Sequence, residues 1–480
     1  MNEELNKWFI SPNSENQAYV TQFFEKIIEQ LVHEKGAASQ KELVPNCTEE
    51  SSMVDELDHS HTMEQVLEQL QLVYQQSMNA SSVGYIGQMD SIPNLGAIIG
   101  DLVTAAINNN MLANEMSPLL SWLELQVVNK FVGWFGFGEG AGGIMTSGGT
   151  LANIQALTVA RNVKLNITDG NLFKVSKEPV LFTSEHSHAS IAKAGMLLGI
   201  GTGNVVKVKT DGTGKMSIPE LREQISQAIQ AGKQPFAVVS TFGTTNSGSL
   251  DDVAAIQALC EEYDLWHHVD AIYGGALALS ASQAELCPAF HQADSLSFNP
   301  QKWMFVSKTC SVLILKDFQQ LDTHFKIPAP YVQDGNKLNL GEYGIQGSRH
   351  GSILKLWLSL YLIGKDKFAE MIDLNMEISQ RFTDYISQHD DLQLYTEPDS
   401  NIILFRPIKR EGQIDSSYQE FLSAFQQYLY SHNHYISLIP WEGESWLKCI
   451  FLNPYFNHKE LESLQVLINQ FFKEVEDSLH

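Results

Sequence analysis

The chain has 480 residues, of which 44% are hydrophobic and 18% are charged, as in globular proteins with a large core. Its formal net charge of −25 disfavours nucleic acids and anionic membranes as partners. An acidic substrate would therefore have to be attracted by a local positive site. The five cysteines follow no CxxC or metal-like spacing, and no carboxylate or cysteine cluster completes a metal site with the histidines. The acidic amino terminus lacks an apolar run, so we expect a reduced, cytoplasmic protein without a targeting segment.

Residues 1–81 have the pattern of helices joined by polar linkers. Apolar side chains recur at helical spacing in residues 20–31 and again in residues 63–73. Two amphipathic helices without strands cannot close a core, so we expect this segment to pack on another surface. A solvent-exposed helical appendage is the alternative.

Residues 82–354 alternate helical patterns with short β-rich runs. This alternation predicts an α/β domain with a mostly parallel central sheet flanked by helices. From residue 355 to residue 480 the runs are fewer, which predicts a small α+β domain. The expected strands of the large domain are residues 180–182, 205–208, 236–240, 265–269, 296–298 and 312–315.

Two of these runs end in a single charged residue. Asp270 follows one run, and Asn299-Pro300-Gln301-Lys302 follows the next. Ligands of α/β folds bind at the carboxyl ends of strands. Apolar residues surround Lys302 in sequence, which predicts a desolvated, nucleophilic amine. An amine for an aldehyde and an anion for a pyridine nitrogen suit pyridoxal phosphate, although singly the two residues could be a surface lysine and a turn residue.

A glycine pair precedes a helical pattern in Ser147-Gly148-Gly149-Thr150. Glycines allow close approach of the backbone to an anion, and a helix amino terminus supplies free N–H groups. We expect Gly149 and Thr150 to bind the phosphate of the cofactor, although such residues also cap ordinary helices.

These motifs, in this order, resemble those of the group II pyridoxal-phosphate-dependent amino-acid decarboxylases. The family includes glutamate, cysteine-sulfinate and aromatic-L-amino-acid decarboxylases. The residues of several of these motifs are most similar to those of its glutamate and cysteine-sulfinate branch. The resemblance implies a fold-type I, transferase-like fold and a homodimer with the active site at its interface, with residues 1–81 as the dimerisation segment. The motifs are Asn110-Met111, residues 147–153 and 183–188, Gly243-Thr244-Thr245, residues 268–271 and 299–302, and Gly347-Ser348-Arg349-His350.

The resemblance also assigns catalytic roles. Lys302 would hold the cofactor, Asp270 would pair with its ring nitrogen, and His188 would stack on the ring. Tyr331, in a loop rich in proline and glycine, would return a proton after carbon dioxide leaves. The alternative for Tyr331 is a side chain packed at the base of the loop.

Further residues are assigned to binding. Thr245 would lie near the ring hydroxyl, and Arg349 would contact the carboxyl end of the substrate, unless it forms a structural ion pair. Asn110 would lie on the substrate side. The other cofactor-binding residues implied are Gly149, Thr150, Ala271, Asn299 and Gln301.

Two residues depart from the usual motifs of the family. Gln301 stands where a histidine is usual, and Ile272 replaces a small residue. Neither change removes a catalytic group, but both weaken the transfer of a substrate from the family to this chain.

We expect α-decarboxylation of an acidic L-amino acid, namely glutamate, aspartate or cysteine sulfinate. Decarboxylation of a basic, diaminobutyrate-like substrate or of an aromatic one remains open. A decarboxylation-coupled amine oxidase is disfavoured by the presence of Tyr331, and an aminotransferase by the Ser184 to His188 run. An inactive regulatory homologue is disfavoured because Lys302, Asp270 and His188 are all retained.

Overall fold

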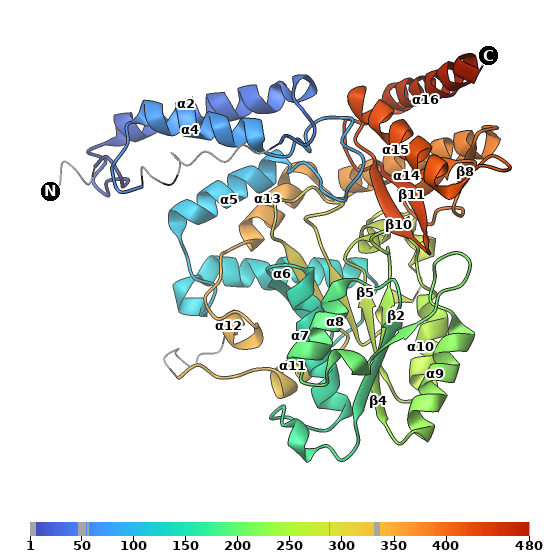
Figure 1. Ribbon diagram of the computed structural model, residues 1–480. Coiled ribbons are helices and arrows are strands. Elements are labelled where there is room, and N and C mark those ends of the chain that lie inside the picture. The colour runs from blue at the N-terminus through green and yellow to red at the C-terminus, as the bar shows by residue number, and fades with distance from the viewer. Residues whose placement is uncertain (1–5, 47–53, 55–56, 288, 331–336, 480) are drawn as a thin grey trace.

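The computed structural model describes residues 6–46, 54, 57–287, 289–330 and 337–479. Figure 1 shows two β-sheets, the larger in the lower body and the smaller at the upper right, with a pair of helices along the top. The large sheet has seven strands and the small sheet has four. Within these residues, no helix is long and apolar enough to cross a membrane.

The large sheet has the order β1-β7-β6-β5-β4-β2-β3. Strands β2 to β6 run parallel to one another, while β7 is antiparallel to both β6 and β1. The predicted mostly parallel sheet is therefore confirmed. The strands are β1 (Gly142–Thr146), β2 (Pro179–Ser184), β3 (Val205–Val208), β4 (Gln234–Thr241), β5 (Trp266–Asp270), β6 (Ser295–Phe298) and β7 (Ser311–Leu315).

Helices cover both faces of this sheet because its side chains are apolar on both. Val180 and Phe182 face one core, and Leu181 between them faces the other, as the period of two along a strand requires. The helices α9 (Ile218–Gln230) and α10 (Val253–Glu262) cover the first face, and α7 (Gly149–Lys164) covers the second. The helix α8 (Ala189–Leu197) packs on α7 (Figure 1).

The small sheet is antiparallel, in the order β10-β11-β9-β8. Residues 84–90 run beside it, because Tyr435 N–H donates to Gly84 O at 2.8 Å and Ile450 N–H to Ile86 O at 2.6 Å. The elements of this unit are β8 (Leu392–Leu394), β9 (Ile402–Pro407), β10 (Ser437–Trp441), β11 (Glu444–Ile450), α14 (Lys365–Gln388), α15 (Asp415–Ser431) and α16 (His458–Leu479).

Among the further helices of the described chain, α6 (Pro118–Trp134) packs on β1 of the large sheet and α11 (Gln319–His324) packs on α7. Later in the chain come α12 (Leu340–Tyr343) and α13 (Ile353–Ile363). The last of these packs against α5 (Leu95–Ile107). Two glycines of α5 allow this approach, since a Cβ on Gly100 would lie 2.3 Å from Lys355 Cα and one on Gly96 2.8 Å from Leu358 O.

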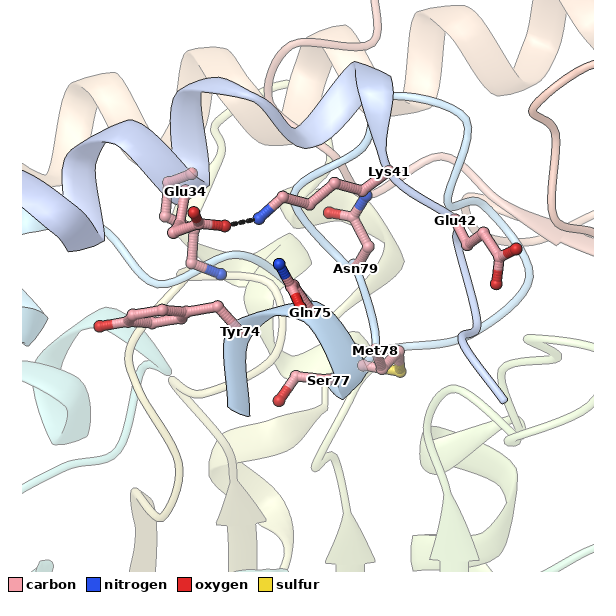
Figure 2. Close-up of a pocket in the computed structure, with 9 residues that line it drawn as sticks. Glu34, Lys41, Glu42, Tyr74, Gln75, Ser77, Met78 and Asn79 are labelled. Carbon is pink, nitrogen blue, oxygen red and sulfur yellow. Dashed lines mark hydrogen bonds and ion pairs between the residues drawn. The ribbon is translucent and has the colours of Figure 1, made fainter. Parts of the chain in front are cut away.

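The amino-terminal segment forms the two long helices that its apolar spacing predicts, α2 (Gln17–Gly36) and α4 (Met63–Gln76). A capping box of Thr62 and Gln65 begins α4. The side chain of Gln30 donates to Leu67 O at 2.9 Å and joins the two helices. Figure 2 shows a small pocket at their end, where Lys41 forms an ion pair with the buried carboxylate of Glu34.

The close approach of α5 and α13 can be tested with one added methyl group. Gly100→Ala should lower the free energy of unfolding by about 1–3 kcal/mol, because the new Cβ overlaps the α13 backbone. Gly133→Ala is the matched control, since a Cβ on this α6 residue meets no atom within 4 Å. The control should raise stability by roughly 0.5–1 kcal/mol. Urea unfolding of both variants measures the difference, and equal effects would contradict the proposed overlap.

Candidate active site

Asp270 and Lys302 lie at the same edge of the large sheet. Asp270 ends β5, and Pro300 follows the end of the adjacent parallel strand β6. A turn closed by Lys302 N–H donating to Asn299 O, at 3.1 Å, then presents the lysine. Phe305, three residues on, has a φ of 55°, a backbone conformation that is costly for a bulky residue and is commonest at functional sites.

The amine of Lys302 lies among apolar side chains. Its Nζ is 3.5 Å from Met89 Sδ and 5.7 Å from the centre of the Tyr273 ring. Desolvation lowers the pKa of Lys302, and the negative charge of Asp270 opposes this shift. A lysine in this setting is available as a nucleophile.

The carboxylate of Asp270 is buried and hydrogen-bonded. It accepts Asn153 Nδ2–H at 2.8 Å and Ile272 N–H at 3.3 Å. Burial raises the pKa of Asp270, while the Asn153 hydrogen bond and the nearby His188 and Lys302 lower it. The carboxylate can therefore neutralise a cationic ring nitrogen at this edge.

His188 caps the amino terminus of α8. Its Nδ1 accepts the backbone N–H of Ser190 at 3.1 Å, so the neutral ring carries its proton on Nε2. Burial lowers the pKa of His188, which favours the neutral form. The ring therefore offers a flat face and one N–H donor.

The phosphate-binding residues predicted from sequence lie at the start of α7. A Cβ on Gly149 would lie 2.2 Å from Ile272 Cδ1, so the branched Ile272 occupies the space that a larger residue at position 149 would need. Thr150 follows in the first turn, where backbone N–H groups are free to bind an anion. Ile272, which replaces the small residue usual in the family, therefore affects the predicted phosphate-binding site at the start of α7.

Asn299, Gln301 and Ala271 flank this cradle and the lysine. Asn299 Oδ1 accepts the Ser311 hydroxyl, and Gln301 Oε1 accepts Cys310 N–H at 2.5 Å. The amide NH₂ groups of Asn299 and Gln301 remain as donors for a phosphate or ring oxygen. A histidine at position 301 would donate from a ring N–H instead of an amide NH₂. Ala271 is buried directly after Asp270.

Arg349 forms the ion pair that the sequence left as an alternative to substrate binding. Its guanidinium donates to both carboxylate oxygens of Glu124, at 2.7 and 2.8 Å, and Glu124 is fully buried. Asn110 is also engaged, because its Oδ1 accepts Leu112 N–H at 3.0 Å and its Nδ2 donates to the Ser348 hydroxyl at 3.0 Å. Substrate binding by Arg349 would have to use the N–H groups that this pair leaves free, or else open the pair.

Thr245 and Tyr331 are the remaining residues predicted from the sequence. Thr245 is exposed in the loop after β4, whereas its neighbour Thr244 is buried and hydrogen-bonded to Ser247 at 2.6 Å. Tyr331 lies outside the described residues.

Sequence reasoning missed Lys448, a buried cation in the small sheet. It lies on β11, is 2% exposed, and no hydrogen bond or ion pair joins its amine to any residue that the structure describes. Burial, with a contribution from the nearby charge of Lys302, lowers the pKa of Lys448 to about 8. In the sequence, Lys448 stands out only as a lysine within an apolar run. The neighbouring residues do not show that its side of β11 faces Lys302.

Asp90 was also missed. Its carboxylate forms an ion pair with the exposed Lys308 and lies close enough to favour the charged forms of both Lys302 and Lys448. Residues 84–90, which run beside the small sheet, thus place the carboxylate of Asp90 near Lys302.

The contact between Ile272 and Gly149 is testable by paired substitution. Gly149→Ala should weaken pyridoxal phosphate binding roughly tenfold or more, because the added Cβ displaces Ile272 or the first turn of α7. Gly149→Ala combined with Ile272→Ala should recover most of that affinity. Titration of the cofactor into the cofactor-free protein measures both. No recovery in the double variant would mean that Ile272 does not set the requirement for glycine.

Comparison with known proteins places these residues in a family. Residues 48–408 match the pyridoxal-dependent decarboxylase conserved domain. The aromatic-L-amino-acid decarboxylase of Bacillus atrophaeus is 30% identical over 66% of this chain and 66% of its own length. The human acidic amino acid decarboxylase GADL1 is 33% identical over 64% of this chain and 60% of its own length. The chain therefore matches slightly less than two thirds of each of these relatives.

Solved structures agree on the fold. Mouse CSAD in its apo form is 25% identical with a TM-score of 0.86, covering 94% of this chain and 98% of that one. Oryza sativa TDC, solved with PLP and tryptamine, is 19% identical with a TM-score of 0.89, covering 97% and 100%. The buried amine, the buried carboxylate and the glycine-led helix of this chain fit the aldehyde, ring nitrogen and phosphate of pyridoxal phosphate. This chain belongs to the pyridoxal-dependent decarboxylase family, as its motifs predicted.

Proposed function

We propose that this protein is an α-decarboxylase of acidic L-amino acids that works with pyridoxal phosphate bound to Lys302. The observation that carries the choice of substrate is Lys448, a buried amine without a partner among the described residues, close to Lys302. A buried cation is costly unless an anion compensates it. A carboxylate of the substrate would supply that anion.

The residues around Lys302 have distinct tasks. Bound pyridoxal phosphate supplies the electron sink for the bond that breaks at the α-carbon. Asp270 keeps the ring nitrogen protonated through its negative charge. His188 covers the ring and presents its Nε2–H to the substrate side. Asn299 and Gln301 donate from the side of the loop, with Gly149 and Thr150 at the phosphate.

Lys448 suits substrate recognition better than Arg349 does. The guanidinium of Arg349 already makes two hydrogen bonds to Glu124, which would be left as a buried, unpaired anion if Arg349 turned away. Lys448 has no ion pair with a described residue that substrate binding would break. The proposal agrees with the names of human GADL1, an acidic amino acid decarboxylase, and mouse CSAD, but the Bacillus atrophaeus relative is named for aromatic substrates.

Asp90 favours a second candidate, a basic substrate of the diaminobutyrate type. Its carboxylate lies near Lys302, and its partner Lys308 has 59% of its side chain exposed. A substrate ammonium could replace that surface lysine at small cost, because an exposed ion pair contributes little.

A substrate panel separates these candidates. Release of carbon dioxide should be fastest with glutamate, aspartate or cysteine sulfinate and slow with tryptophan and 2,4-diaminobutyrate. Lys448→Met should lower kcat/KM for the acidic substrate roughly 10- to 100-fold, the range expected for a lost charge-assisted hydrogen bond.

Lys448→Arg, which retains the charge, is the matched control and should lose much less activity. Aromatic or diamino acids as the best substrates of the natural protein, or an unchanged kcat/KM in Lys448→Met, would refute the assignment.

We also propose a homodimer in which residues 1–81 and α5 cover each other's apolar faces. Large apolar side chains are exposed over α2 and α5, including Ile28 at 48%, Val32 at 65%, Leu95 at 69% and Ile99 at 49%. A patch of this kind is unusual on a monomer, and twofold pairing is the commonest way to cover it. Tyr331 would then act as the proton donor in the active site of the neighbouring subunit.

Hybrid dimers test this arrangement. Lys302→Ala and Tyr331→Phe chains, each inactive in amine formation, should regain up to about a quarter of the natural activity when mixed after unfolding, because random pairing makes half of the dimers hybrids and each hybrid has one intact site. Each variant refolded alone is the control. Sedimentation of the natural protein as an active monomer would exclude the proposal.

A further inference from the structure

Asn153 is the most fully hydrogen-bonded polar side chain around the candidate active site. It is 0% exposed in the first turns of α7. Its Nδ2 donates to Asp270 Oδ2 at 2.8 Å and to Ser190 Oγ at 3.0 Å. Its Oδ1 accepts Ser297 Oγ–H at 2.7 Å and lies 3.1 Å from His268 Nε2. All four hydrogen-bonding positions of the amide are therefore used.

The surrounding groups fix which way this amide points. Trp266 Nε1, which can only donate, lies 2.8 Å from Ser295 Oγ, so the hydroxyl of Ser295 donates its own proton to His268 Nδ1 at 2.8 Å. Burial lowers the pKa of His268 to about 3, so the ring is neutral and its one proton lies on Nε2. That proton points at Asn153 Oδ1. The NH₂ group of the amide must then face Asp270.

We propose that Asn153 is a positioning residue that keeps Asp270 in its ionised form and aimed at the ring nitrogen of the cofactor. The inference rests on the proposed function. Asp270 has lost its water, which favours the neutral acid, and the Asn153 N–H stabilises the carboxylate through a short hydrogen bond that the neutral acid would accept less strongly. The backbone N–H of Ile272, at 3.3 Å, is the weaker second donor.

The same NH₂ group connects Asp270 to His188. Its second N–H donates to Ser190 Oγ, and the Ser190 hydroxyl lies 2.9 Å from His188 Nδ1. One amide on α7 thereby holds both the carboxylate that would pair with the ring nitrogen of the cofactor and the imidazole that would stack on the ring. The titratable groups facing Asp270 are His188 from α8 and Lys302 after β6, and both favour its ionised form.

The pH profile of the loaded enzyme distinguishes this role from a purely structural one. Asn153→Ala removes the donor, so Asp270 should ionise only at higher pH, and the acidic limb of kcat should move up by about one pH unit. The loss of kcat should then be about tenfold at the acidic end and much smaller at the alkaline end. Asn153→Ser, whose hydroxyl is too short to replace the amide, is the second variant should Asn153→Ala fail to fold.

Asn375→Ala is the matched control. Asn375 is 1% exposed and its Oδ1 accepts the Nε1–H of Trp303, the residue after Lys302, at 2.8 Å, so this substitution also removes a buried, hydrogen-bonded amide. It should lower the melting temperature without moving the acidic limb.

A second readout needs neither cofactor nor substrate. A buried carboxyl with a raised pKa makes the folded state bind more protons than the unfolded one, so its stability contribution falls as the pH rises above the unfolded value. The loss of melting temperature in cofactor-free Asn153→Ala should therefore grow as the pH rises above the ordinary pKa of an aspartate, because burial raises the pKa of Asp270 and the lost hydrogen bond would raise it further. In an Asp270→Asn background, which has no charge to stabilise, it should not depend on pH.

The outcomes separate the two hypotheses. A natural protein without decarboxylase activity would refute the proposed function but leave the melting experiment valid. An active protein in which Asn153→Ala lowers kcat equally at every pH, with a pH-independent loss of melting temperature, would overturn the role of Asn153.

Discussion

A buried carboxylate and a buried amine, Asp270 and Lys302, lie at the carboxyl ends of β5 and β6 and influence each other's charge. Desolvation alone would drive Asp270 to its neutral acid and Lys302 to its neutral amine. Each charge therefore depends on what the rest of the fold supplies. The carboxylate receives hydrogen bonds from Asn153 and Ile272, whereas the amine lies beside the thioether of Met89 and the ring of Tyr273. This asymmetry favours an anion beside a reactive amine, which is the arrangement that a pyridoxal site needs.

The site also depends on the small sheet. Backbone hydrogen bonds to Tyr435 and Ile450 hold residues 84–90 against β10 and β11. The same strand β11 carries Lys448, and the held segment carries Met89 and Asp90 to the lysine of the large sheet. Tyr273, directly after the β5 turn, hydrogen-bonds Asn401 of the small unit at 2.7 Å. The two sheets thus share a polar boundary that positions the charges of the site.

The sequence predicted the parts that are local. Apolar runs ending in Asp270 and in Asn299-Pro300 identify strands and the edge at which they end, because strand burial and proline have local signatures. The glycine pair before α7 has a local signature as well. Lys448, Asp90 and the pairing of Arg349 with Glu124 have none, since each depends on residues far apart in the chain. The effect of Ile272 is similar: its contact with Gly149 follows from the packing of α7 on the β5 loop.

The overall charge of the protein affects how a substrate approaches the site. The chain carries a net charge of −25, so a dicarboxylic substrate approaches against a repulsive field. Asp90 adds a further negative charge beside the site, and Lys308, its partner, compensates it at the surface. Lys448 forms no hydrogen bond or ion pair with a described residue, although Asp90 favours its charged form, and its buried position weakens screening by salt. On the function proposed above, a carboxylate bound at Lys448 would gain from this local charge, and an acidic protein could in this way bind an acidic substrate.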